Sequence, residues 1–515
     1  MISGGSNLTN LNNLNNLPNI HPGQNNYNNN MIYNNQMLYA NMNNPAKDQN
    51  MNFNPMRGSV LSGQVNTQLI NQIDIQKTTQ ANPVTQMDIE QELTKIYELQ
   101  KEEELRVEIG KGESLKITIE SGSAEIEGAE LPLNYPIEHS YKKFSIFCWT
   151  EARIRVQGNI QNIYTSSSNQ GTMIQYLMAH HLINEKRNEA LVSNKIGPIV
   201  LVTGSNQSGK HTLCHIFINY ALKLGWTPIY ADLDLNNEIG VTGTIAATPV
   251  DYVIPNEYMI DSSIMLFHGN TMNDVNIFLY EKQIEEMASL VKNKLEHNLE
   301  MFKKKFSINN EYSTLTEFIN PEQPSLFASG AIIHCPMIEA SKDNQIYKTI
   351  IEQFEADVVF VIENEKLFNV VKNLNATVST SENKATVCLL QKTQGINQET
   401  SYRDYLELNR FDSYFKGPFN NIKINEFSID LTQYKLMKII FSNVTSALLP
   451  IGSTSDLNII LKEVNHSEEN LLNKIVAILH LDDKVISDLE KNYDKNLNSY
   501  VEHFARAPVS FLAYM

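Results

Sequence analysis

The chain has 515 residues, which is longer than one ordinary domain and enough for two or three. Hydrophobic residues make up 42% of it and charged residues 19%, so much of the chain can bury a core. The formal net charge of −17 argues against a protein that binds nucleic acid through its whole surface. Any contact with RNA has to come from a local basic site.

Targeting and redox signals are few. The sequence has no apolar run near the roughly 20 residues that a membrane span needs, and we expect no membrane association. The first residues lack a basic segment followed by an apolar stretch, so we expect no signal peptide. The four cysteines are scattered, without a Cys-x-x-Cys pair. This pattern fits a reduced intracellular compartment and indicates neither a disulfide framework nor a zinc knuckle.

The first 90 residues differ in composition from the rest. Twenty of the first 60 residues are Asn, and charges are nearly absent there. Such a segment has little apolar surface to offset the entropy of ordering, so we predict a disordered tail over residues 1–90. The same composition also arises in an A/T-rich genome without any function behind it.

Short strands dominate the next region. After an acidic stretch at 89–104, which we predict to be helical, apolar residues alternate in four segments, 105–109, 115–119, 144–147 and 154–156. Glycines at the turns separate these segments. The spacing predicts a small N-terminal β-sandwich within residues 91–170.

Helices and buried strands alternate from residue 171 to 416. Helical patterns cover 173–189, 213–224 and 277–306, and apolar strand patterns cover 197–203, 228–234, 331–334 and 356–362. This order predicts an α/β domain with a central parallel sheet and helices on both faces. Strands return after residue 417, with a polar helical stretch at 468–496, and predict a small C-terminal α+β domain over 417–515.

A phosphate-binding loop lies between the strand at 197–203 and the following helix. Gly204-Ser-Asn-Gln-Ser-Gly-Lys210 matches the pattern Gly-x₄-Gly-Lys in the strand–loop–helix context that the pattern requires. The glycines let successive backbone N–H groups point at a phosphate, and the helix N-terminus adds positive potential. Lys210 would bridge the β- and γ-phosphate oxygens, so the loop predicts nucleotide binding.

The residue after Lys210 departs from the pattern. Ser or Thr, whose hydroxyl binds Mg²⁺, is expected there, but the sequence has His211, and Thr212 follows it. Imidazole is a poor ligand for Mg²⁺, and successive helical residues point about 100° apart, so Thr212 does not simply substitute. His211, Cys214 and His215 share one helix face, but no zinc-protease pattern accompanies them and we do not expect a metal site on that face.

Asp234 ends the strand pattern at 228–234 and is the candidate acidic residue. An aspartate there can hold the hydration shell of Mg²⁺ or accept a proton from an attacking hydroxyl, although a strand-end turn residue is the simpler alternative. Asp232 points to the same side but lies two residues further from the loop, so we do not expect it to be equivalent. Thr212 and Asp234 are thus the weak candidates for holding a metal.

Segments in all three folded regions resemble one family, in the order in which that family has them. They lie at 104–108, 124–131, 143–149, 197–204, 219–225, 357–362 and 448–452. The chain from about residue 100 onward resembles the Clp-type polyribonucleotide 5′-hydroxyl kinases, subunits of the pre-mRNA cleavage and polyadenylation machinery. The resemblance implies an N-terminal β-domain that packs on the nucleotide, a P-loop domain and a small C-terminal domain.

The resemblance also implies site residues. Glu104 and Lys143 correspond to nucleotide contacts of the N-terminal domain, and Asp234 to a general base and metal-shell carboxylate. The phosphate cradle would be formed by Gly204, Gln207, Ser208, Gly209, Lys210, His211 and Thr212. ATP, with or without Mg²⁺, is the implied cofactor. If the chain were active, Lys210, Asp234 and Arg403 would be its catalytic residues.

Four departures concern the elements of phosphoryl transfer. His211 replaces the hydroxyl residue, and 235–237 replaces the Gly-Gln pair that follows the aspartate in active members. The stretch 335–339 has no aromatic residue where those members have a tryptophan that clamps the 5′ base. Of the two lid arginines, Arg403 matches the second, but Gln398 stands where the first is expected.

Three functions follow as hypotheses. The first is a catalytically silent, ATP-binding subunit of the nuclear pre-mRNA 3′-end processing complex, in contact with its scaffold subunits. The second is an active kinase that phosphorylates 5′-hydroxyl ends of RNA in mRNA or tRNA processing. The third is a P-loop NTPase unrelated to RNA.

Overall fold

The computed structural model describes residues 94–158, 162–236, 239–253, 263–270, 275–308, 325–336, 344–378, 384–394, 400–417, 421–424, 435–441, 459–464, 474–492 and 500–514, and the single residues 426, 428, 430 and 471. All of them belong to one compact unit, Glu90–Met515. The tail predicted at 1–90 and the lid residue Gln398 lie outside the described residues.

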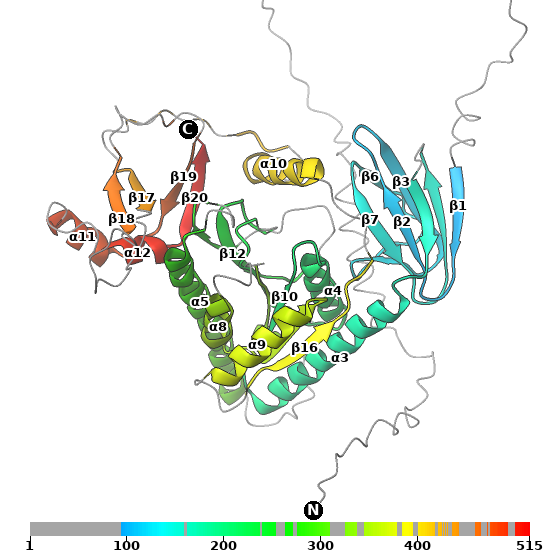
Figure 1. The fold of residues 1–515 in the computed structure, drawn as a ribbon, viewed down its shortest axis with the longest axis horizontal. Helices are drawn as coiled ribbons and strands as arrows, with labels where there is room; N and C mark the ends of the chain where they lie inside the picture. The colour runs from blue at the N-terminus through cyan, green and yellow to red at the C-terminus, as the bar shows by residue number, and fades with distance from the viewer. Residues whose placement is uncertain are drawn as a thin grey trace, which may run out of the picture. The chain divides into compact units, whose positions relative to one another are not determined.

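The first folded region is the expected β-sandwich, drawn in blue to cyan in Figure 1. Its strands are β1 (Thr94–Leu99), β2 (Glu104–Glu108), β3 (Ser114–Gly122), β4 (Glu125–Ile126), β5 (Ala129–Glu130), β6 (Ile137–Ser140), β7 (Lys143–Phe147), β8 (Ala152–Gln157) and β9 (Asn162–Ser166). They pair antiparallel in two sheets, with the orders β1-β8-β3-β6 and β5-β4-β7-β2-β9. Leu115, Ile117 and Ile119 of β3 are buried, as period-two alternation requires.

The helix predicted over 89–104 is wrong. Within its described part, Thr94–Leu99 form β1, which pairs antiparallel with β8 along its whole length, and β2 begins at Glu104. The acidic residues of 89–104 favour a helix locally, but cross-strand pairing decides the conformation of this edge strand.

The central sheet has seven strands. They are β10 (Ile199–Gly204), β11 (Ile229–Asp232), β12 (Thr244–Pro249), β13 (Ile264–Phe267), β14 (Ala331–His334), β15 (Val358–Ile362) and β16 (Thr386–Leu390). Their order is β13-β12-β11-β14-β10-β15-β16. The pairs from β11 to β16 are parallel as expected, whereas β12 and β13 add an antiparallel edge, so the sheet is mixed.

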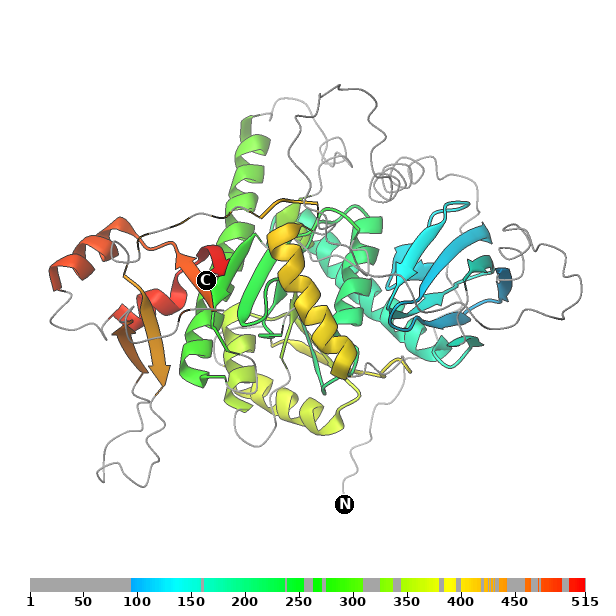
Figure 2. The same cartoon turned by 90° about the horizontal axis from the view of Figure 1, so that it is seen from above.

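Helices cover both faces of this sheet (Figures 1 and 2). On one face α3 (Gln170–Ser193) and α4 (Lys210–Lys223) share a core with Val200 and Val202. On the other face α5 (Ile277–Ile308), α8 (Asn344–Phe354) and α9 (Glu365–Thr377) share a core with Leu201 and Ile333. Alternate residues of a strand face opposite ways, which explains how β10 serves both cores. The short helix α7 (Leu326–Ser329) leads into β14.

The C-terminal region consists of small sheets and short helices, as expected. Helix α10 (Thr400–Lys416) precedes β17 (Met437–Phe441), β18 (Ile459–Glu463), β19 (Ile475–Leu479), α11 (Asp483–Asn492), α12 (Val501–Arg506) and β20 (Val509–Tyr514). The predicted polar helix at 468–496 is only partly correct, because β19 occupies part of its first half and pairs with β20, and only α11 is helical among its described residues. An apolar run of five residues in that segment favours a strand over a helix.

Candidate nucleotide-binding site

The phosphate loop has the conformation that its sequence predicts. It leaves β10 at Gly204 and enters α4 at Lys210. Gln207 and Gly209 adopt positive φ angles of 55° and 84°, which turn the backbone sharply before the helix. The side chain of Ser208 is buried, and its Oγ has no hydrogen-bond partner among the described residues. A buried hydroxyl and the N–H groups of the first helical turn together offer donors to an anion.

Lys210 lies over the loop and is 8% exposed. Its Nζ donates to the carbonyl oxygens of Gly204 and Ser205, at 3.5 and 3.2 Å. Burial lowers the pKa of Lys210, while the nearby charge of Asp234 opposes that shift. These residues fit the polyphosphate of a nucleotide, because the loop supplies donors and one cation but no competing anion from its own sequence.

His211 faces two polar residues at the ends of neighbouring strands. Its Nε2 lies 3.0 Å from Nδ1 of His334 and 3.3 Å from Oδ2 of Asp232. Nδ1 of His334 in turn lies 2.6 Å from Oδ1 of Asp232. Asp232 and His334 are almost completely buried, whereas the His211 side chain is 26% exposed. We call these three residues the His–Asp–His cluster.

Strand register explains this cluster. Asp232 ends β11, His334 ends β14, and the two residues are direct partners in the parallel pair. Burial disfavours ionised Asp232, but the two histidines outweigh that effect and hold its pKa well below the ordinary value. Burial, with His211 close by, also lowers the pKa of His334. Sequence reasoning ranked Asp234 above Asp232, but Asp232 is the carboxylate that contacts His211.

Asp234 follows the strand and is half-buried. Its backbone N–H donates to Oδ1 of Asp232 at 3.0 Å, and its own Oδ1 accepts from the backbone N–H of Asn236 at the same distance. Its charge nevertheless acts on Lys210. Asp234 therefore lies in a turn near the phosphate loop. It is bonded to Asp232 of the His–Asp–His cluster through its backbone N–H but is not a member of the cluster.

Thr212 is turned toward the N-terminal sandwich. Its Oγ1 donates to Oε1 of Glu127 at 3.1 Å, and Nδ1 of His215 lies 2.8 Å from Oε2 of the same carboxylate. Asn219 donates to the backbone oxygen of Glu127 at 2.9 Å. Glu127 lies in the tight turn between β4 and β5, so this hairpin sits on helix α4. From the sequence alone only a turn at Gly128 was evident, and sequence reasoning missed this role of Glu127.

The expected contacts of the sandwich with a nucleotide lie on two paired strands. Glu104 is buried and accepts from Nε of Arg106 at 2.5 Å and from Nδ2 of Asn169 at 3.1 and 3.0 Å. Lys143 pairs with Glu108 at 3.4 Å. In the register of β2 and β7, Glu104 is opposite Phe147, and Lys143 is opposite Glu108. Glu104 and Lys143 therefore lie at opposite ends of this strand pair.

The clamp and lid elements are only partly described. Cys335 is buried directly after β14, and burial raises the pKa of its thiol to about 12; residues 337–339 lie outside the described residues. Arg403 is exposed on α10. Next to it, Tyr402 and Tyr405 pack on Tyr141 of the sandwich, with ring centroids 5.3 and 4.7 Å away.

Mg²⁺ fits these residues less well than the nucleotide does. Mg²⁺ requires oxygen ligands in near-octahedral geometry. At the position of the usual hydroxyl the structure has the imidazole of His211, and the hydroxyl of Thr212 is bonded to Glu127. Two of the three groups in the His–Asp–His cluster offer nitrogen.

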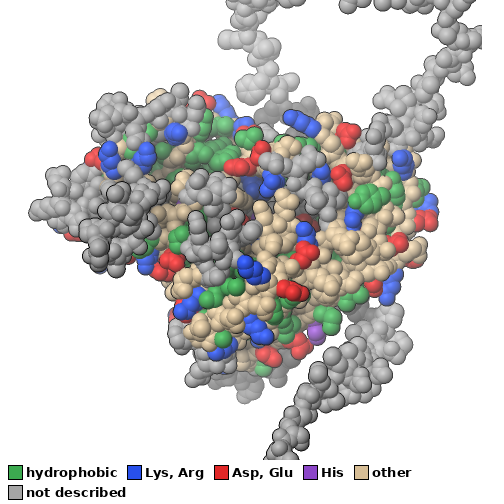
Figure 3. Space-filling view, viewed as in Figure 1, with side chains coloured by type: hydrophobic (Ala, Val, Ile, Leu, Met, Phe, Trp, Pro, Cys, Tyr) green, Lys and Arg blue, Asp and Glu red, His purple; other side chains and the backbone are tan. Residues whose placement is uncertain are grey.

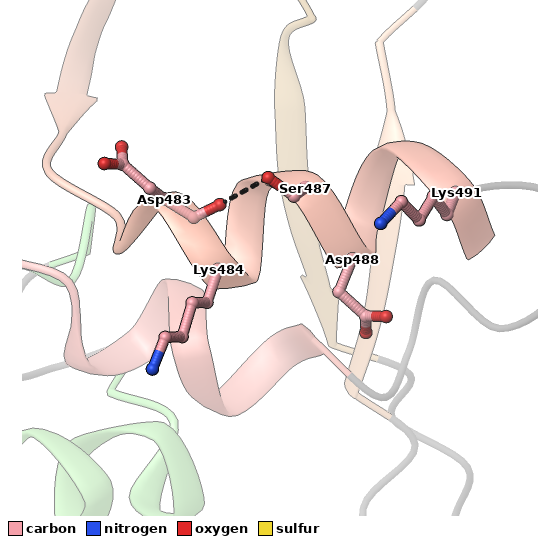
Figure 4. A pocket seen from close by; sticks show the side chains of 5 residues that line it. All are labelled: Asp483, Lys484, Ser487, Asp488 and Lys491. Carbon is pink, nitrogen blue, oxygen red and sulfur yellow. Dashed lines mark hydrogen bonds between the residues drawn. The ribbon is translucent and has the colours of Figure 1, made fainter.

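A second surface feature lies among the described residues of the C-terminal region. A surface depression on α11 (Figure 4) is lined by side chains of both charges: Asp483, Lys484, Ser487, Asp488 and Lys491. Ser487 donates there to the backbone oxygen of Asp483, and Asp488 accepts from Tyr500. Figure 3 shows acidic and basic side chains interspersed on the face it draws. Among the described helices, none is long and apolar enough to cross a membrane.

Comparison with known proteins identifies two consecutive domains. A family model described as the N-terminal beta-sandwich domain of polyadenylation factor matches residues 98–190. A second, described as the P-loop of the mRNA cleavage and polyadenylation factor CLP1, matches residues 204–311. The first lies over the observed sandwich, and the second begins at the first glycine of the phosphate loop.

The similarity to individual proteins extends over most of the chain. A protein CLP1 homolog of Anopheles gambiae is 28% identical over 390 residues, which are 74% of this chain and 84% of that protein. The polyribonucleotide 5′-hydroxyl-kinase Clp1 of Homo sapiens is 26% identical over 372 residues, 70% of this chain and 79% of that protein.

A solved structure of the wild-type Clp1p–Pcf11p complex has the same fold. Its TM-score is 0.61 at 19% identity, and the match covers 82% of this chain and 90% of that one. Domain models, relatives and fold thus agree along the chain from the sandwich onward: the chain carries matches to the N-terminal and P-loop domains of the Clp1 family and is similar to its members over most of its length.

Proposed function

We propose that this protein is an ATP-binding subunit of the nuclear pre-mRNA 3′-end cleavage and polyadenylation complex that transfers no phosphate. The observation that carries the proposal is that intact phosphate-binding groups and an altered metal-binding position occur together at the start of α4. The loop keeps the donors for a polyphosphate, Ser208 and Lys210, while His211 is engaged with Asp232 and His334.

Retention of ATP without transfer follows from what phosphoryl transfer demands. Transfer needs an ion coordinated by the γ-phosphate, charge stabilisation and an acceptor in line. The imidazole of His211 does not replace the oxygen ligand, and the sequence has Gln398 at the first lid position. Such losses are not additive, because these groups act as a unit. Binding uses the loop itself, which is intact.

Membership of the complex is proposed from relatives. A solved relative is described as a complex of Clp1p with Pcf11p, and another structure of that pair concerns ATP loss in a glycine-to-arginine point mutant. We therefore propose a partner of the Pcf11 kind among the scaffold subunits of the cleavage factor, and a location in the nucleus.

The test measures the bound nucleotide and the phosphoryl transfer to RNA on the same preparation of protein. Mass spectrometry of the purified chain should find ATP, and Lys210→Ala should remove most of it, because a charge-assisted contact is worth about 1.5–3 kcal/mol. Lys195→Ala, at an exposed lysine just after α3, is the lysine control for nucleotide content.

The same preparation is incubated with labelled ATP and a 5′-hydroxyl RNA. We expect no labelled RNA above background. Robust phosphorylation that disappears in Asp234→Ala would contradict the proposal and would support the active kinase instead. ATP content unchanged in Lys210→Ala would contradict binding through this loop.

A further inference from the structure

We infer that His211, Asp232 and His334 form a binding site for one transition-metal ion of the Zn²⁺ kind. No part of the proposed function requires this ion, and the site exists whether or not a nucleotide is bound. The inference starts from the convergence of three ligand atoms, one from each side chain, that all lie within 4.8 Å of one another.

The spacing of these atoms is close to that of a metal site. A tetrahedral Zn²⁺ with bonds of about 2.0–2.1 Å separates its ligand atoms by roughly 3.3 Å. The two contacts of His211 Nε2 are 3.0 and 3.3 Å. Nδ1 of His334 lies 2.6 Å from the other carboxylate oxygen, Oδ1, so the carboxyl group of Asp232 has to rotate slightly to offer one oxygen to an ion held by both imidazoles.

While Asp232 is ionised, protons alone do not satisfy all three contacts. An imidazole nitrogen carries either a hydrogen or a lone pair. If Nδ1 of His334 carries hydrogen, it donates to ionised Asp232, but this hydrogen then repels any hydrogen on Nε2 of His211. If it carries a lone pair, it accepts from His211 but faces a carboxylate oxygen at 2.6 Å with no hydrogen between them. A cation at the centre is attractive to all three atoms.

The chemical types of the three ligand atoms indicate which ion the site prefers. Two imidazole nitrogens and one carboxylate oxygen suit Zn²⁺ and its neighbours in the first transition series, whereas Mg²⁺ prefers oxygen alone. Three protein ligands leave the fourth position of a tetrahedral ion open to water or another oxygen. If the proposed nucleotide binds, a phosphate oxygen is the natural fourth ligand, because His211 lies in the first turn of α4 beside Lys210.

The surroundings allow an ion to enter and to be held. Asp232 and His334 are buried on the ends of β11 and β14, where strand pairing fixes their positions. His211 is partly exposed and closes the site from α4. The bound ion would therefore join a helix and two strands that are distant in sequence, and it should stabilise the central domain against unfolding.

The experiment uses the full chain, stripped of metal by a chelator, dialysed, freed of nucleotide and titrated with Zn²⁺ alone. Metal analysis after desalting should give one Zn²⁺ per chain, and the midpoint of thermal unfolding should rise with Zn²⁺. His211→Ser and His334→Asn should each weaken Zn²⁺ binding by more than the 10–100-fold typical of an outer-sphere change. His181→Ala, which removes an exposed histidine of α3, should bind Zn²⁺ as the parent does.

A second readout covers the case in which the His334 variant fails to fold. Co²⁺ added to the parent should produce the intense visible absorption of a four-coordinate ion, and the partly exposed His211→Ser substitution should abolish it. No stoichiometric Zn²⁺ in the folded parent, or an affinity unchanged in both variants, would overturn the inference. Because no nucleotide is present, a failure of ATP binding leaves this result unaffected, and the reverse also holds.

Discussion

His180 and His181 are neighbours on α3 in opposite surroundings. His180 is 4% exposed, packs near Tyr220, and its Nε2 finds no hydrogen-bond partner in the part of the chain that the structure describes. Burial, with Arg187 close by, lowers the pKa of His180 from 6.5 to about 3. The folded protein therefore keeps this imidazole neutral where the unfolded chain protonates it.

This difference predicts a loss of stability in mild acid. Between the two pKa values the unfolded state binds one more proton, so the free energy of unfolding falls as the pH falls. The share of His180 is about 2 kcal/mol from about pH 7 to about pH 5. Urea unfolding at both pH values should show a smaller drop for His180→Gln than for the parent. The matched variant His181→Gln should keep the parental drop; an equal drop in all three proteins would refute the prediction.

The two aspartates at the end of β11 show what sequence reasoning could reach. The pattern identified a strand that ends in acidic residues near the phosphate loop, and it favoured Asp234 by proximity along the chain. The partner of Asp232 is His334, about 100 residues later, and only the strand order brings β14 beside β11. Polar residues at the carboxyl ends of two apolar strands were the available signal, because such ends meet at one edge of a parallel sheet.

At the scale of elements, the β4–β5 hairpin holds the sandwich against helix α4. Gly128 has a φ of +80°, and a Cβ there would lie 3.2 Å from Cα of Ile216 and from the ring of Tyr220. Glu127, beside it, bonds to Thr212, His215 and Asn219. The hairpin thus has both a steric and a polar reason to keep this turn.

A pair of glycine substitutions separates backbone strain from packing. Gly112 has a similar φ of +85° but nothing within 4 Å of its Cβ position. Gly112→Ala should lower the free energy of unfolding by about 1–2 kcal/mol from strain alone. Gly128→Ala should lose about 1–3 kcal/mol more, because its neighbours have to move. Urea unfolding of both variants measures the difference, and equal losses would show that the hairpin contact is not tight.

Element prediction succeeded where the local pattern and the fold agree. Strand β14 was predicted with its observed bounds, and the strand, loop and helix around Lys210 were correct within a few residues. The edge strand β1 and the antiparallel strands β12 and β13 were not foreseen. Their conformations depend on partners elsewhere in the chain, and local propensity does not contain that information.

At the scale of the molecule, several ion pairs connect outer regions to the central domain, and two of them differ in burial. Glu125 of the sandwich is buried and accepts from Trp149, Tyr220 and Lys223. Near the C-terminus, Arg506 of α12 contacts Glu285 of α5 at 2.6 Å, and both side chains are partly exposed. The two contacts join different regions and differ mainly in burial.

Burial should decide how much each contact stabilises the protein. Glu125→Gln replaces a buried charge that has three donors, and we expect a loss of about 1.5–3 kcal/mol in the free energy of unfolding. Glu285→Gln removes the partly exposed pairs of this carboxylate with Arg506 and Lys282, which water already screens, so its loss should stay below about 1 kcal/mol. Urea unfolding of the two variants at the same pH and ionic strength compares them directly. A larger loss for Glu285→Gln would mean that the C-terminal contact, rather than the sandwich contact, carries the connection to the central domain.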